Sequence, residues 1–305
     1  MELEWNGKNI TNAVNITGCV HRDESCGRCD SLELTLDHAS RWYSWNPEED
    51  DEIIITSGGY STGRMYLNTI IPDGDQFRIL ATSLKRAAGR KAWASYTETT
   101  LQGIVDKCAA ECGMEGKLYG IDGGLKYPYI LRQNEGAAAF LNRIGQWEGL
   151  AVKALNGAFR GVSVAFAQER KADISIEISS KQDGVTYRRR DNTKYSMLTV
   201  QTPYGKATAR DAKAKGNNST ILTHLPAMDN AQAGRWARGL ILMHNRQAEE
   251  MTLETALNLR LIAMTRVDVT GSTAMAGKWI VDESEHDLFN ERSSVKFLRV
   301  IDSVQ

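Results

Sequence analysis

The 305-residue sequence lacks several features, and each absence excludes a class of protein. No run of about 18 apolar residues occurs, which excludes a transmembrane helix. The start, MELEWNGKNI, is acidic and polar, whereas a secretory signal needs a basic start and an apolar run. The formal net charge is −1, so no overall basic field points to a nucleic acid or an anionic membrane.

Proline and cysteine are also scarce. Five prolines and no low-complexity linker predict domains that pack together or interleave. Five cysteines cannot all pair within one chain, which favours reduced thiols and a cytoplasmic protein. The length predicts two or three domains with an ample core.

Strand patterns dominate both ends of the chain. Residues 32–36 and 174–178 alternate apolar and polar side chains, and turn residues at 57–59 and 72–75 separate further strands. Later strands are expected at 185–190, 195–201, 251–262, 277–282 and 295–301, whereas residues 203–225 are expected to form a loop. The prediction is a β-rich α+β fold.

Three segments change to a helical period. Apolar residues between Leu101 and Cys112 fall at offsets 0, 3, 4, 7, 8 and 11, which predicts a helix that Gly113 ends. Further helices are expected at 135–148, with Phe140, Leu141 and Ile144 buried together, and at 229–245. Asn156-Gly157 lies between two apolar runs, 150–155 and 159–166, and predicts a hairpin.

The stretch CVHRDESCGRCD holds the candidate metal ligands Cys19, His21, Cys26 and Cys29. Cys26 and Cys29 have the C-x2-C spacing of a zinc knuckle, and four ligands would complete a tetrahedral site. No second paired element follows at a set distance, because the remaining two cysteines lie on the apolar face of a predicted helix. The sequence therefore favours a loop between strands, with reduced thiols and no metal.

Gly59–Gly63, GYSTG, matches the G-x-S-x-G nucleophile elbow around Ser61. That elbow needs a strand before the serine and a helix after it, but residues 64–70 have the pattern of a strand. His286, flanked by acids, has no partner marked by its context. We predict a hairpin turn, a structural histidine, and no catalytic residue or cofactor. The enzymatic alternatives are a serine hydrolase using Ser61 with His286 and a metal-dependent peptidase using the cysteine loop.

Two central stretches resemble phage tail baseplate hub proteins: WASYTETTLQGIVDKCAAECGM and RQNEGAAAFLNRIGQWEGLAVKALNG. This family includes the late-control D proteins, the hubs of Mu-like and T-even phages and the N-terminal part of the VgrG spike. The matching positions are Trp93, Thr100, Leu101, Ile104, Gln133, Glu135, Phe140, Leu141, Arg143 and Gly149.

The two ends of the chain follow the same family order. They are LEWNGKNIT…DSLELTLDHASRWYSWNPEEDDEIII and GKWIVDESEHDL…SSVKFLRVID. Residues 136–139 depart from the family pattern, because members carry a second acid and bulkier side chains there. The loop that holds Cys26 and Cys29 is not a family feature.

The resemblance implies two tail-tube-like β-barrels with interleaved strands plus a small helical α/β insert. The first barrel would comprise residues 1–90, completed by strands from about 170–200, and the helical insert with its hairpin residues 91–168. Residues 169–305 would supply the second barrel, the C-terminal strands and one helix. No lysozyme or needle segment follows, so wall cleavage and the piercing tip are expected on other proteins.

The implied function is that of a structural, non-enzymatic hub. Three copies would give six barrels, which match a six-fold tail tube, while the trimer matches a three-fold central spike. The implied partners are the chain itself, the tube and spike proteins, and the tape measure and baseplate wedge proteins. Neither nucleic-acid specificity nor a membrane anchor is expected. The place would be the tail baseplate of a phage or of an R-type bacteriocin, after assembly in the host cytoplasm.

Overall fold

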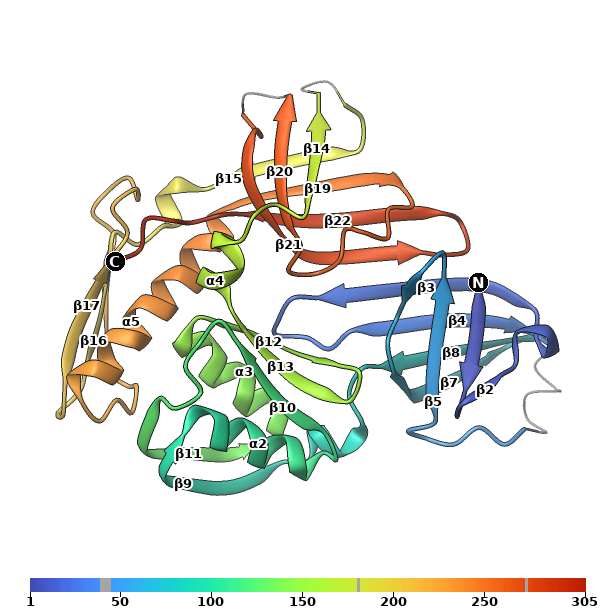
Figure 1. Ribbon diagram of the computed structural model, residues 1–305, viewed down its shortest axis with the longest axis horizontal. Helices are drawn as coiled ribbons and strands as arrows, with labels where there is room; N and C mark the ends of the chain where they lie inside the picture. Colours follow the sequence, from blue (N-terminus) through green and yellow to red (C-terminus); the bar gives the residue numbers. More distant parts are fainter. Residues whose placement is uncertain (39–44, 180–181, 272–273) are drawn as a thin grey trace.

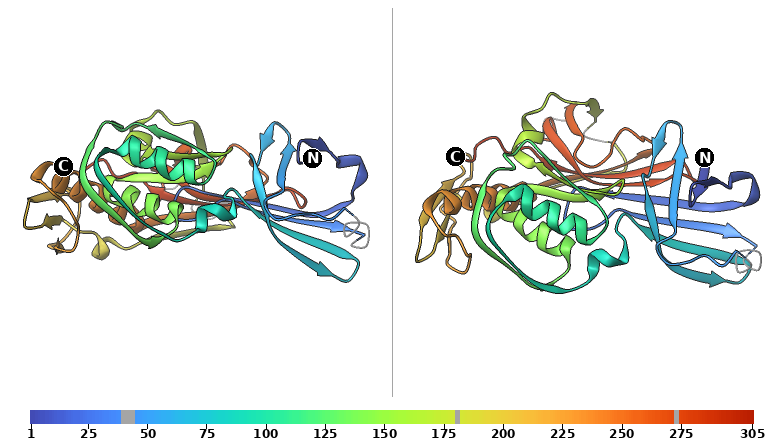
Figure 2. Two further views of the ribbon diagram at one scale, coloured as in Figure 1. Left: turned by 90° about the horizontal axis from the view of Figure 1, so that it is seen from below. Right: turned by 60° about the horizontal axis from the view of Figure 1, so that its bottom comes forward.

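The computed structural model describes residues 1–38, 45–179, 182–271 and 274–305. One long, bent sheet runs through the molecule, and a helical insert packs beside it (Figure 1). The sheet has two halves with separate hydrophobic cores. The first half projects away from the insert, and the second half lies along it (Figure 2).

The first half surrounds a core that includes Leu34, Ile53 and Phe77, all fully buried. The alternation predicted for residues 32–36 places Leu32, Leu34 and Leu36 on this core. The elements are β1 (Glu2–Trp5), β2 (Lys8–Asn9), η1 (Thr11–Ala13), β3 (Ile16–Glu24), β4 (Ser31–Asp37), β5 (Glu52–Ser57), β6 (Tyr60–Ser61), β7 (Met65–Asp73) and β8 (Gln76–Thr82). The short helix η2 (Arg86–Gly89) follows and packs on the insert.

The second half surrounds a core that includes Met251, Trp279 and Phe297. Its strands are β14 (Ile174–Ile178), β15 (Val185–Arg189), β19 (Glu249–Ala256), β20 (Arg266–Gly271), β21 (Gly277–Asp287) and β22 (Arg292–Arg299). The long strand β21 pairs with β20 at its start and with β3 at its end, which joins the two halves into one sheet.

The two halves share one strand order. Without the two-residue strands β2 and β6, the first half runs β3-β4-β8-β7-β5-β1, and the second runs β15-β19-β22-β21-β20-β14. Numbered along the chain within each half, both orders are 2-3-6-5-4-1. All neighbours are antiparallel except β14 and β20, which are parallel. The chain therefore contains a structural repeat.

The insert packs α2 and α3 on a three-stranded sheet, β10-β13-β12, and on the ribbon β9-β11. Thr100 begins α2, because its side chain accepts a hydrogen bond from Gly103 N at 3.1 Å, and Gly149 ends α3 in the left-handed conformation. The bounds are β9 (Ala92–Thr100), α2 (Leu101–Glu111), β10 (Glu115–Tyr119), β11 (Lys126–Glu135), α3 (Ala137–Glu148), β12 (Leu150–Leu155), β13 (Ala158–Ser163) and α4 (Val164–Glu169).

A last unit packs α5 between a small sheet and the insert (Figure 1). A side-chain carbon at Gly239 of α5 would lie 2.1 Å from Trp147 O, so the glycine permits the backbones of α3 and α5 to approach closely. The elements are η3 (Asp191–Thr193), β16 (Met197–Gln201), β17 (Lys206–Arg210), β18 (Ser219–Leu222), α5 (Asn230–Asn245) and η4 (Arg246–Ala248).

The β-rich class and the three long helices are confirmed, but several finer predictions are wrong. Strands β14 and β15 pair with β20 and β19 in the second half, and β16 lies in a separate small sheet, so the strands from about 170–200 do not complete the first half. A period-2 pattern identifies a strand but not its partner, which is why this pairing was missed. The predicted loop 203–225 contains β17 and β18, and the predicted strand 251–262 ends at Ala256.

Two further boundaries differ. The strand expected at 159–166 ends at Ser163, whose side chain accepts a hydrogen bond from Phe166 N and begins α4. No closed sheet occurs among the described residues, so the barrels stay a prediction. Residues 39–44 of the opening family stretch lie outside the described residues.

Candidate functional site

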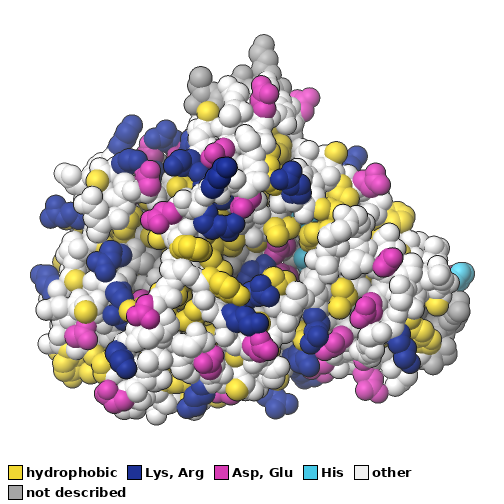
Figure 3. Space-filling view, viewed as in Figure 1, with side chains coloured by type: hydrophobic (Ala, Val, Ile, Leu, Met, Phe, Trp, Pro, Cys, Tyr) yellow, Lys and Arg dark blue, Asp and Glu magenta, His cyan; other side chains and the backbone are white. Residues whose placement is uncertain are grey.

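A cavity of about 700 Å³ opens where the first half, the insert and the segment before β20 meet. It is visible as a hollow near the middle of one face, with hydrophobic and basic side chains around it (Figure 3). The lining includes the turn 58–63, the β12–β13 hairpin and residues 259–264. Three parts of the chain therefore lie next to one another around this cavity.

A buried ion cluster fixes that junction. Lys153 of β12 binds the carboxylates of Asp23 on β3 and Asp30 before β4, the latter with 3.1 Å between Nζ and Oδ2. Ala263 N donates to Asp23 Oδ2 at 2.8 Å, and Asp30 Oδ1 accepts from Glu24 N at 3.0 Å. The cluster therefore ties the insert to the first half and to the segment before β20. One ammonium group therefore contacts both carboxylates.

The environment shifts these pKa values in opposite directions. Burial, together with the charge of Asp23, raises the pKa of Asp30 from 3.8 to about 7, although Lys153 acts against this. Burial also raises the pKa of Asp23, but the charge and hydrogen bond of Lys153 outweigh it and hold that pKa below its usual value. The pKa of Lys153 is raised, because burial is outweighed by the two carboxylates.

Asp30 is expected to make stability fall as pH rises from about 4 to about 7. In this window the folded chain keeps a proton on Asp30 that the unfolded chain has lost, so raising the pH favours unfolding. Urea unfolding of the wild type and of Asp30→Asn at several pH values measures the effect. The stability of the wild type relative to Asp30→Asn should decrease across the window, and a constant difference would contradict the raised pKa.

Two histidines face each other where the halves join. His21 on β3 lies opposite His286 on β21, and the ring of Tyr60 packs edge-on against both. His21 Nδ1 shares a hydrogen bond with Tyr60 Oη at 2.6 Å, and His286 Nδ1 shares one with Ser293 Oγ at 2.8 Å. Burial lowers the pKa of His21 to about 4, so both sheet halves meet across uncharged rings at neutral pH.

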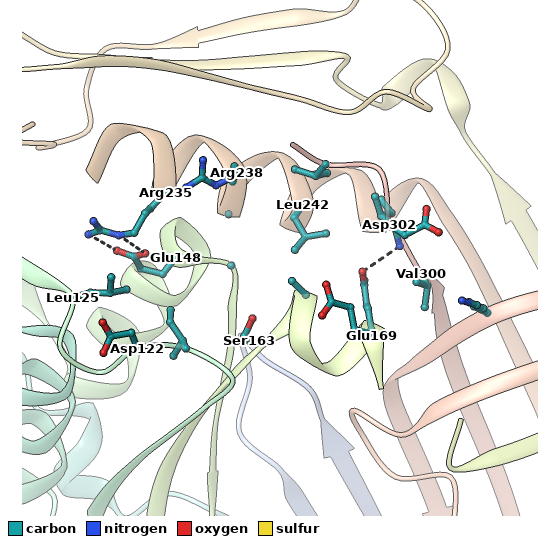
Figure 4. Close-up of a pocket in the computed structure, with 18 residues that line it drawn as sticks. Asp122, Leu125, Glu148, Ser163, Glu169, Arg235, Arg238, Leu242, Val300 and Asp302 are labelled. Atoms are coloured by element: carbon teal, nitrogen blue, oxygen red, sulfur yellow. Dashed lines mark hydrogen bonds and ion pairs between the residues drawn. The ribbon is translucent and has the colours of Figure 1, made fainter. Parts of the chain in front are cut away.

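A second cavity, of about 550 Å³, is lined by parts of the insert, by α5 and by the C-terminal segment 300–304. Glu148, at the end of α3, lies at one side of it and points toward Arg235 of α5 (Figure 4). Glu148 Oε1 accepts hydrogen bonds from Tyr127 Oη at 2.6 Å and Trp236 Nε1 at 2.9 Å. This carboxylate therefore links the insert to α5 and is fully satisfied by structural partners.

The candidate metal ligands lie in separate surroundings. Cys19 and His21 belong to β3 rather than to the predicted loop, and Cys19 is fully buried in the core of the first half. At roughly 3.3 Å per residue, Cys19 stands roughly 15 Å from the loop that holds Cys26 and Cys29. Burial raises the pKa of the Cys19 thiol to about 12 and raises those of Cys26 and Cys29. Within the described ranges, no three His, Cys, Asp or Glu residues are grouped to hold a metal ion.

The hydrolase motif also lacks its context. Ser61 lies in the short strand β6, which the strand β7 follows, so no helix follows the serine. Ser61 Oγ accepts a hydrogen bond from Gly63 N at 3.1 Å, whereas His286 is bound to Ser293. Each of these two side chains therefore makes a hydrogen bond to a partner other than the one that the hydrolase alternative pairs it with.

Sequence reasoning missed the two buried carboxylate clusters. Lys153 interrupts an otherwise apolar strand, LAVKAL, and a lone lysine in such a run is the signal that would have found it. Glu148 carries no such signal, because a helix end with a carboxylate is common on protein surfaces.

Among the described residues, no helix is long and apolar enough to cross a membrane. No family model matches the sequence, and no curated protein matches it.

Solved structures do match the fold. The 43 kDa tail protein of prophage MuSo2 from Shewanella oneidensis has a TM-score of 0.75 at 14% identity, over 99% of this chain and 98% of that one. A tail protein from Neisseria meningitidis has a TM-score of 0.74 at 9% identity, over 98% of this chain and 97% of that one. An E. coli component of the type VI secretion system, described as similar to the T4 tail proteins gp27 and gp5, has a TM-score of 0.61 at 11% identity, over 98% and 76%. The chain therefore has the fold of these tail and type VI secretion proteins, which confirms at the level of the fold the resemblance seen in its sequence.

Proposed function

We propose that this chain is the structural hub at the tip of a contractile tail, in a phage or in a phage-like particle such as an R-type bacteriocin. Three copies would join a six-fold tail tube to a three-fold central spike. The observation that supports this most is the shared 2-3-6-5-4-1 strand order of the two halves. Two similar units in each of three copies give six similar units, which match a six-fold tube. A trimer with one such unit per chain would present only three.

The proposed partners follow from this arrangement. One face of the ring would contact the tube protein and the other the spike, with tape measure and wedge proteins as further neighbours. Each half would close into a barrel in the assembled ring, since exposed strand edges are stabilised by pairing or cover. The ring would assemble in the host cytoplasm and act in the tail baseplate.

Removing the Ser61 hydroxyl separates this function from the hydrolase alternative. Ser61→Ala is expected to leave folding and particle assembly unchanged, because the side chain is exposed and its hydrogen bond with Gly63 N is local. Complementing a host that lacks the gene with wild type or variant, and counting intact tails by electron microscopy, measures this. Intact tails that no longer cleave a cell-wall substrate would instead favour the hydrolase.

A further inference from the structure

The charge of the chain is divided unevenly between its two ends. Residues 1–82, which form the first half, hold 14 Asp and Glu but 6 Lys and Arg, a formal net charge of −8. Residues 83–305 hold 24 Asp and Glu and 31 Lys and Arg, a formal net charge of +7. Opposite fields on one chain favour contacts in which the first half of one copy meets the remainder of another, a head-to-tail arrangement.

The junction cavity offers the basic side of such a contact. Beyond the Asp23–Lys153–Asp30 cluster, its charged lining consists of Arg160, Arg170 and Arg260. Arg170 is paired with Asp173, but Arg160 Nε is buried without a hydrogen-bond partner in the described part of the chain.

The rim of the cavity is apolar. Tyr119, Phe166 and Ile262 line it and are 41%, 45% and 41% exposed, although large hydrophobic side chains usually gain from cover. Guanidinium groups form strong hydrogen bonds with carboxylates, and the apolar rim would pack against the rest of a protruding segment that carries them.

The tip of the β7–β8 hairpin offers the acidic side. Its turn, Pro72-Asp73-Gly74-Asp75, is exposed, and Asp37 at the end of β4 lies in the same row of strand ends. Among the described residues, His38 is a basic group that faces the tip, and its Nδ1 lies 3.7 Å from Asp75 Oδ2. Gly63 lines the cavity, and β7 begins two residues later at Met65. The strand places the tip roughly 26 Å from Met65, so the tip does not reach the cavity of its own chain.

We propose that the acidic hairpin tip of one copy, with Asp73 and Asp75, docks in the junction cavity of a second copy, facing Arg160 and Arg260. This proposal rests on the proposed homotrimer and names the contact that would hold it. Each copy supplies one tip and one cavity, so the contact repeats around a ring.

Charge reversal with rescue tests the contact. The tip variant is Asp73→Lys with Asp75→Lys, the cavity variant is Arg160→Glu with Arg260→Glu, and the combined variant carries all four changes. Sedimentation velocity at about 50 mM and about 500 mM salt measures association of the purified full chain. Wild type should associate at low salt, and each variant should need at least about tenfold more protein to do so. The combined variant should return close to wild type.

Controls separate the contact from general effects. Glu48→Lys with Glu49→Lys changes the net charge as much as the tip variant does, but on an exposed segment outside both surfaces, and should leave association unchanged. Circular dichroism checks folding. Arg260→Glu alone, at an exposed position, replaces the cavity variant where the change at Arg160 impairs the fold.

A wild-type chain that stays monomeric at low salt would overturn the proposal, as would variants that associate like wild type or a combined variant that associates less than either. If either of these variant results is found while the wild type still forms a trimer, the proposed hub function would stand, because other contacts would then hold the ring. Binding of the spike or tube protein in the cavity in place of a second copy would also overturn it.

Discussion

Lys153→Met is expected to lower the free energy of unfolding by about 3–5 kcal/mol at pH 7, because it leaves the buried charge of Asp23, and that of Asp30 where it is ionised, without a cation. Asp23 and Asp30 are 7% and 1% exposed, so water replaces little of what the ammonium group supplies. The loss should be smaller at pH 4, where protonation removes carboxylate charge. Urea unfolding at both pH values measures it.

Lys117→Met is the matched control for that change. Lys117 lies in the same insert, but its ion pair with Glu115 is exposed on both sides, so its loss should cost less than about 0.5 kcal/mol. Equal losses for the two lysines would show that the junction cluster contributes no more than a surface pair.

Phe140→Ala is expected to cost about 3–5 kcal/mol, since it leaves a cavity in a closely packed core. Phe140 is fully buried in the core of the insert and stacks on Tyr96 with 5.2 Å between ring centroids. The measurement is again urea unfolding, and the control is Phe289→Ala at a side chain that is 47% exposed. A loss for Phe140→Ala close to that of the control would mean that the insert relaxes around the cavity or contributes little to folding.

The helices of the insert were predictable because their signals are local. A 3.6-residue period places Phe140, Leu141 and Ile144 on one face, and all three are buried in α3. The Asn156-Gly157 hairpin likewise follows from two residues that adopt positive φ angles, 51° and 72°.

The pairing of distant strands was not predictable in the same way. Strands β14 and β15 have the expected alternation, but their partners β20 and β19 lie sixty or more residues away in the sequence. The repeated strand order is equally hidden, because the connection between β15 and β19 contains a small sheet and α5, whereas the corresponding connection between β3 and β4 is a short loop. Period-2 patterns define faces and leave such partners open.

The same distinction between local and distant signals applies to the candidate sites. The strand after Ser61 was predictable, since residues 64–70 have a strand pattern where a nucleophile elbow needs a helix. Cys19 was placed in a loop although β3 continues to Glu24, because charged residues after Val20 hid the inward alternation of His21 and Asp23. The Asp23–Lys153–Asp30 cluster joins Lys153 to carboxylates 130 and 123 residues earlier in the chain, which no local sequence pattern can predict.

The central claim is that each chain supplies two similar units to a three-fold hub. A reconstruction of the isolated tail tip by cryo-electron microscopy, without imposed symmetry, tests it most directly. The account predicts three copies of this chain, with six sheet halves in a ring against the tail tube and a three-fold face against the spike. A copy number other than three, or a ring in which one half of each chain stands away from the tube, would contradict it.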